Sequence, residues 1–77
     1  MNSWFQTWNR PEYKEWATEI PEGYLLVIIR KESKQYLCVK AKLLMGETGL
    51  PGFEVIEEYR FETLKKASDQ ISAWKKA

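Results

Sequence analysis

The chain has 77 residues and a formal net charge of +1, from 12 basic and 11 acidic side chains. This length fits one small domain, and 44% hydrophobic with 30% charged residues is typical of a globular chain. The charge lacks the positive excess that usually accompanies binding to nucleic acid or to an anionic membrane. These bulk properties favour neither of those partners.

The inventory of chemical groups argues against catalysis. The chain has no histidine and a single cysteine, Cys38. It therefore lacks the commonest general base and metal ligand, and a lone cysteine cannot form an intramolecular disulfide. We expect a non-enzyme without cofactor or metal, in a reducing, cytoplasmic setting. No apolar run is long enough to span a membrane, and the first ten residues do not resemble a signal peptide.

The N-terminal segment, residues 1–21, is rich in aromatic side chains. Ser3 with Gln6 fits a capping box, and Pro11 suits the first position of a second short helix. We therefore predict a partly helical segment. The sequence Pro21-Glu22-Gly23 predicts a turn into the first strand.

Three runs, 24–30, 35–44 and 53–61, predict strands because they are rich in β-branched or aromatic residues. Polar or glycine-rich connections, including a long glycine-rich hairpin loop at 46–52, indicate an antiparallel meander. Alternation in the second run predicts a core face and a mostly polar face. The core face carries Leu37, Val39, Ala41 and Leu43, and the polar face carries Tyr36, Cys38, Lys40 and Lys42.

A pairing of Leu43 with Phe53 predicts that Lys42 faces Glu54 and Tyr36 faces Arg60. Such cross-strand pairs account for the acidic residues of the third run without an active site. The same alternation places Phe53, Val55, Tyr59 and Phe61 on one face. The first run is apolar on both faces, so we expect the N-terminal segment or a partner chain to cover one of them.

The last element is an amphipathic helix that begins after Thr63, a good N-cap. Four apolar residues lie within an arc of about 80°: Leu64, Ala67, Ile71 and Trp74. Lys65 and Lys66 point away from this face, and Asp69 partly neutralises them. The fold class is therefore α+β, one domain at 1–77. A three-stranded meander (24–61) packs against the C-terminal helix (63–76), and the N-terminal segment covers the other face.

Two resemblances concern nucleic acid. FETLKKASDQISAWKK, residues 61–76, resembles the last helix of double-stranded-RNA-binding domains, which implies phosphate contacts by Lys65 and Lys66. The family's histidine-containing loop is absent. The three-stranded sheet resembles DNA-binding domains of the integrase and AP2 kind. That resemblance implies an exposed face with Arg30, Tyr36, Lys40, Lys42 and Arg60.

The function expected from the sequence is a small non-catalytic protein-interaction or regulatory module of a bacterial or phage type. The contacts are Trp4, Trp8 and Trp16, because tryptophan is a favoured interface anchor. The partner is another protein or a second copy of the chain. The alternative is a nucleic-acid-binding domain that uses Tyr36, Lys40, Lys42, Arg60, Lys65 and Lys66.

Overall fold

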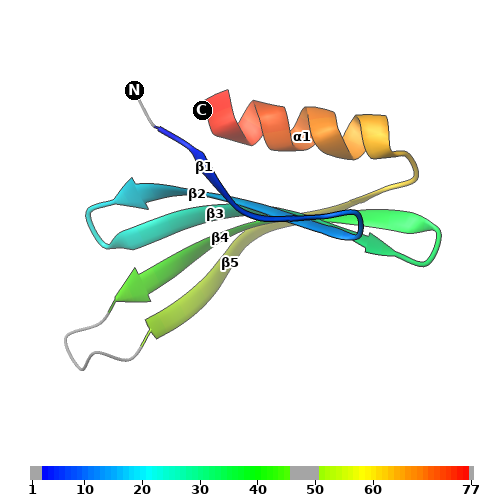
Figure 1. The fold of residues 1–77 in the computed structure, drawn as a ribbon. Coiled ribbons are helices and arrows are strands. Elements are labelled where there is room, and N and C mark those ends of the chain that lie inside the picture. Colours follow the sequence, from blue (N-terminus) through cyan, green and yellow to red (C-terminus); the bar gives the residue numbers. More distant parts are fainter. Residues whose placement is uncertain (1–2, 46–50, 77) are drawn as a thin grey trace.

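The computed structural model describes residues 3–45 and 51–76, so most of the predicted glycine-rich loop lies outside the described residues. Five antiparallel strands form one sheet in the order β1-β2-β3-β4-β5, and one helix follows. The elements are β1 (Phe5–Arg10), β2 (Tyr13–Ile20), β3 (Gly23–Glu32), β4 (Gln35–Met45), β5 (Pro51–Phe61) and α1 (Leu64–Lys76). Figure 1 shows α1 on one face of the sheet, while no described segment covers the opposite face.

The prediction of a three-stranded sheet with a partly helical N-terminal segment is wrong. The segment forms a β1–β2 hairpin, and β2 adds to the edge of β3 along its whole length. Arg10 pairs with Tyr13 around a two-residue turn at Pro11 and Glu12. Aromatic and β-branched residues favour strands, and the open edge of β3 offers backbone partners to such a segment. These effects outweigh the local helix-start signals.

The three predicted strands and the C-terminal helix are confirmed, as is the pairing of Leu43 with Phe53. Tyr36, however, pairs with Phe61 instead of Arg60, because the register shifts by one residue between Lys40 and Ala41. A bulge of this kind moves all later side chains to the opposite face. The prediction that Phe53, Val55, Tyr59 and Phe61 share a face is therefore wrong.

The buried core lies between α1 and the sheet. It consists of Val27, Ile29 and Cys38 from the sheet and Ala67, Ile71 and Trp74 from α1. Cys38 belongs to the strand face that the sequence predicted to be mostly polar, so this part of the prediction is also wrong. Alternation shows which residues share a face but not which face the helix covers.

Charged residues on the helix side, such as Lys42 and Glu54, stay at least partly solvated because α1 covers only part of the sheet. In Figure 1 the strand ends nearest the β2–β3 turn extend past the helix. Lys42 lies on this side, and its Nζ is 3.8 Å from a carboxylate oxygen of Glu22. The helix side is therefore apolar under α1 and charged beyond it.

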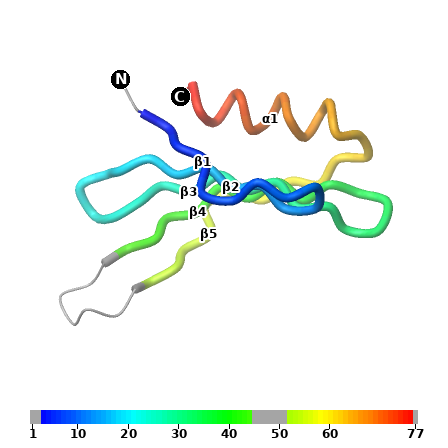
Figure 2. The backbone as a smooth tube through the Cα atoms, viewed as in Figure 1, coloured from blue at the N-terminus to red at the C-terminus, as the bar shows by residue number. Residues whose placement is uncertain are grey.

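Both ends of α1 are capped. The Thr63 hydroxyl accepts a hydrogen bond from the Lys66 backbone N–H at 3.3 Å, which confirms the predicted N-cap. At the other end, the Trp4 indole N–H donates to the Lys75 carbonyl at 3.0 Å. This bond brings the segment before β1 next to the last turn of α1 (Figure 2). Within 3–45 and 51–76, no helix is long and apolar enough to cross a membrane.

Candidate functional site

The face of the sheet opposite α1, called here the open face, carries apolar side chains on every strand. Strand register places five exposed apolar side chains on it: Phe5 and Trp8 of β1, Tyr24 of β3, and Phe53 and Val55 of β5. Their exposed fractions run from 37% for Tyr24 to 57% for Phe53. Apolar side chains gathered in this way mark interaction surfaces, whereas single exposed ones are ordinary.

The centre of the open face is lower than its rim. Ala17, Leu26, Ile28 and Ala41 lie on this face and are buried, the least exposed being Ala41. They form a floor under the protruding aromatic rings. A mostly apolar hollow of about 260 Å³ is lined by Phe5, Ala17, Tyr24, Leu26 and Leu43, together with Thr7 and Glu15, which hydrogen-bond to each other. The open face thus combines protruding rings with a recess that could receive one.

The open face also carries charges. Glu15 and Glu19 of β2 lie on it, and Arg30, Glu32, Glu58 and Arg60 gather at the end nearest the β3–β4 turn. A guanidinium nitrogen of Arg60 lies 3.4 Å from a carboxylate oxygen of Glu58 and another lies 3.8 Å from Glu32. Arg30 lies 4.0 Å from Glu32. Such exposed pairs add little stability. They do leave this end of the face close to electrically neutral.

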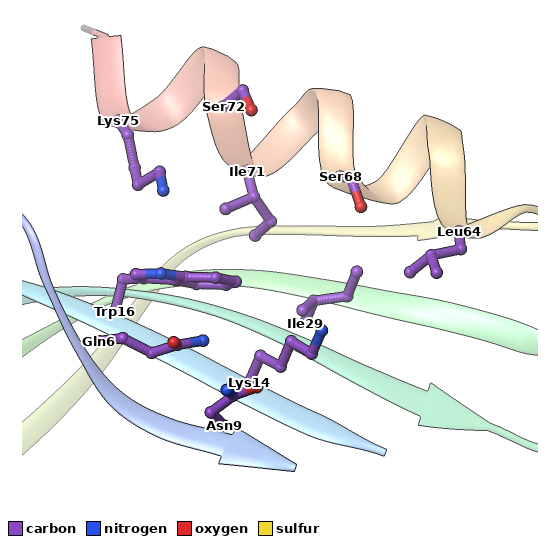
Figure 3. A pocket seen from close by; sticks show the side chains of 10 residues that line it. All are labelled: Gln6, Asn9, Lys14, Trp16, Ile29, Leu64, Ser68, Ile71, Ser72 and Lys75. Atoms are coloured by element: carbon purple, nitrogen blue, oxygen red, sulfur yellow. The ribbon is translucent and has the colours of Figure 1, made fainter. Parts of the chain in front are cut away.

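A second surface is the groove between α1 and the β1–β2 hairpin (Figure 3). It exists because α1 packs on β3, β4 and β5, so a gap opens between the helix and the helix side of β1 and β2. The groove has a volume of about 340 Å³. Its lining residues are Gln6, Asn9, Lys14, Trp16, Ile29, Leu64, Ser68, Ile71, Ser72 and Lys75.

The predicted partner-binding tryptophans do not form one surface. Trp8 lies on the open face and is 51% exposed. Trp16 lies on the helix side, where the Lys75 ammonium is 4.6 Å from the centroid of its ring. Trp4 is partly buried against the core and caps α1. Of the three, only Trp8 is placed to meet a partner at the open face.

The residues of the nucleic-acid alternative are also divided. Arg30 and Arg60 lie on the open face, whereas Tyr36, Lys40 and Lys42 lie on the helix side. Lys65 and Lys66 are exposed on α1, and the Lys65 ammonium pairs with Asp69 at 3.5 Å. The prediction that the sheet residues share one exposed face is wrong, because Arg30 and Arg60 both pair with Leu37 and therefore lie on the opposite face from its neighbour Tyr36.

The groups most capable of chemistry are engaged in structure. The Cys38 thiol is fully buried and donates to the Ala67 carbonyl at 3.5 Å, and burial raises its pKa to about 11. Glu57 accepts a hydrogen bond from the Trp74 indole at 3.0 Å and another from the Tyr59 hydroxyl at 3.2 Å. Residues 3–45 and 51–76 contain no cluster of three potential metal ligands among His, Cys, Asp and Glu.

The open face was not predicted from the sequence, because the strand face with Leu37, Val39, Ala41 and Leu43 was expected to lie in the core. The alternation in the second strand did identify Ala41 and Leu43 as sharing an apolar face with their neighbours. The missing signal was the pattern of β2, in which Trp16 and Thr18 alternate with Glu15 and Ala17. A strand there would have shown that the N-terminal segment joins the sheet and does not cover its second face.

Comparison of the chain with protein-family models, with curated proteins and with solved structures finds no match.

Proposed function

We propose that the protein is a non-catalytic interaction module that docks a second copy of itself through the open face. The observation that supports this most is the set of exposed apolar side chains Phe5, Trp8, Tyr24, Phe53 and Val55 beside an apolar hollow. A second copy is a suitable partner because its open face carries the same exposed apolar side chains. Rings that protrude from one copy have a recess to enter on the other.

The size of the open face suits a modest dimer. Five strands spaced about 4.8 Å apart span about 19 Å, and an eight-residue strand is about 26 Å long. The projected area is therefore roughly 500 Å² per copy, or about 1,000 Å² for two, which is near the lower limit for a specific interface. We expect a dissociation constant on the order of 10 μM rather than an obligate dimer.

The charges do not oppose this pairing. Arg30 and Arg60 lie near the β3–β4 turn, whereas Tyr24 and Phe53 lie towards the opposite end of the sheet. A two-fold axis that makes the strands of the two copies antiparallel would set the arginines over the aromatic rings. Guanidinium groups are attracted to the faces of such rings. The net charge of +1 also gives little repulsion between copies.

The nucleic-acid alternative has weaker support. Its sheet residues are divided between two faces, and Arg60 and Lys65 are each paired with a carboxylate. A chain without histidine, whose one thiol is buried, likewise gives little support to an enzyme.

Sedimentation velocity across a concentration series tests the proposal. We expect the wild-type protein to shift from monomer to dimer, and Val55→Glu to weaken the dimer at least about tenfold, because it would bury an unpaired carboxylate. Leu64→Glu is the matched control: Leu64 is also about half exposed, at 52% against 48% for Val55, but lies on α1. The proposal fails if the wild-type protein stays monomeric into the millimolar range, or if the control weakens association equally.

A further inference from the structure

The groove between α1 and the β1–β2 hairpin has a chemistry that neither the core nor the open face explains. Two of its lining residues are lysines, Lys14 and Lys75, and none is acidic. Ser68 and Ser72 project hydroxyl groups from α1 on the same side (Figure 3). Trp16 and Ile71 supply flat and apolar surface next to these polar groups.

We propose that this groove binds a small organic anion, one that carries a carboxylate or phosphate on a flat apolar body. Its volume of about 340 Å³ falls within the usual range for small-molecule sites, about 300–1,000 Å³. Such sites combine apolar walls with a few convergent polar groups. Here the ammonium and hydroxyl groups supply donors for the anion, and the indole supplies a wall for the apolar body.

The donors in the groove are free to bind. Within 3–45 and 51–76, the Lys14, Ser68 and Ser72 side chains make none of the side-chain hydrogen bonds or ion pairs. Lys75 has its ammonium over the Trp16 ring, at 4.6 Å from the centroid. This contact holds one cation at the groove in the absence of ligand, which lowers the entropic cost of binding.

Two features disfavour an anion at the ends of the groove. The last turn of α1 carries the negative end of the helix dipole, and the hollow adjoining the other end includes Glu12. The dipole acts mainly within the last turn. We therefore place the anionic group at mid-groove, between the two lysines and beside Ser68 and Ser72.

A titration of the isotope-labelled full chain with three probes tests this site: benzoate, phenyl phosphate and the uncharged benzamide, at constant ionic strength. The resonances to follow are the Trp16 indole N–H and the Ser68 and Ser72 amides. For ligands of this size we expect a dissociation constant on the order of 1 mM for at least one of the anions. Benzamide should cause little change. Equal shifts with benzamide, or no saturable shift with either anion, would overturn the proposal.

Variants separate a defined site from general charge attraction. Lys75→Gln and Lys14→Gln should each weaken anion binding by about threefold or more, since each removes a charged donor. Lys66→Gln removes the same charge from the same helix outside the groove and should leave affinity nearly unchanged. An equal loss with Lys66→Gln would overturn the proposal. Because Lys14 lies on β2 and Lys75 on α1, one variant still tests the site if the other misfolds.

Discussion

Chemical modification of the Cys38 thiol should be far slower in the folded chain than in the unfolded chain. The sequence alone placed Cys38 on a mostly polar strand face, whereas the structure buries it under α1 with no exposed surface. Thiol reagents attack the thiolate, so both access and the pKa control the rate. The rate of modification therefore tests which face of the sheet the helix covers.

Cys38 in the folded chain can react by two routes: as the buried thiolate, or after local opening of the structure. Burial raises the pKa of the thiol from 9.0 to about 11. At pH 8 the thiolate fraction then falls from about one in eleven to about one in a thousand, which is roughly 90-fold. The alternative route is local opening, and an opening free energy of about 3 kcal/mol would slow the reaction roughly 150-fold. We therefore expect a folded-state rate at least about 50-fold below the unfolded rate.

The assay is the reaction of the native protein with a disulfide reagent at pH 8, followed by absorbance, with the same reaction in denaturant as the reference. Cys38 is the sole cysteine, so the signal has one source. A matched control carries Ala73→Cys in a Cys38→Ala background, because Ala73 is exposed on α1. It should react at close to the reference rate. A native Cys38 rate within tenfold of that control would refute the assignment of Cys38 to the helix-covered face.

Two further predictions concern stability, measured by urea unfolding. Gly23→Ala should destabilise the protein by at least about 2 kcal/mol, because a Cβ there would lie 2.1 Å from the Leu43 carbonyl oxygen and φ is 151°. Gly52→Ala, whose Cβ would meet nothing closer than 3.9 Å, should change stability by less than about 0.5 kcal/mol. Equal effects would contradict the close strand contact at Gly23. The last prediction concerns pH. The pKa of the Cys38 thiol is raised in the folded state, so the unfolded state loses its thiol proton first as pH rises. The stability that the protonated thiol contributes is therefore present below pH 9 and is lost as pH rises towards 11. Relative to Cys38→Ala, the free energy of unfolding of the wild-type protein should fall by about 2 kcal/mol between pH 8 and pH 10.5. If the stabilities of the two proteins change in parallel with pH, this prediction is contradicted.

Local signals predicted the elements that depend on a single segment. The C-terminal helix has a clear apolar face and an N-cap at Thr63, and the structure contains both. The three strands of the predicted meander were also predicted correctly, because β-branched residues and turn residues are signals that a few neighbouring positions carry. Leu64 is the one member of the predicted helix face that remains 52% exposed.

The rest depends on interactions that alternation alone does not encode. The bulge opposite Lys40 and Ala41 reverses the faces of β5, and one inserted residue leaves no strong mark on composition. The N-terminal segment carried plausible helix signals, but pairing with β3 satisfied its backbone as a hairpin. Once β1 and β2 widen the sheet, α1 no longer covers the helix side completely. The groove follows from that width, and the open face follows from the N-terminal segment joining the sheet instead of covering it.

Self-association through the open face can be followed residue by residue in a concentration series of amide chemical shifts from micromolar to millimolar protein. We expect concentration-dependent shifts to gather on the open face, at Phe5, Trp8, Tyr24, Phe53 and Val55, while the outer side of α1 stays unchanged. Shifts centred on α1, or no shifts over the whole range, would contradict self-association through the open face.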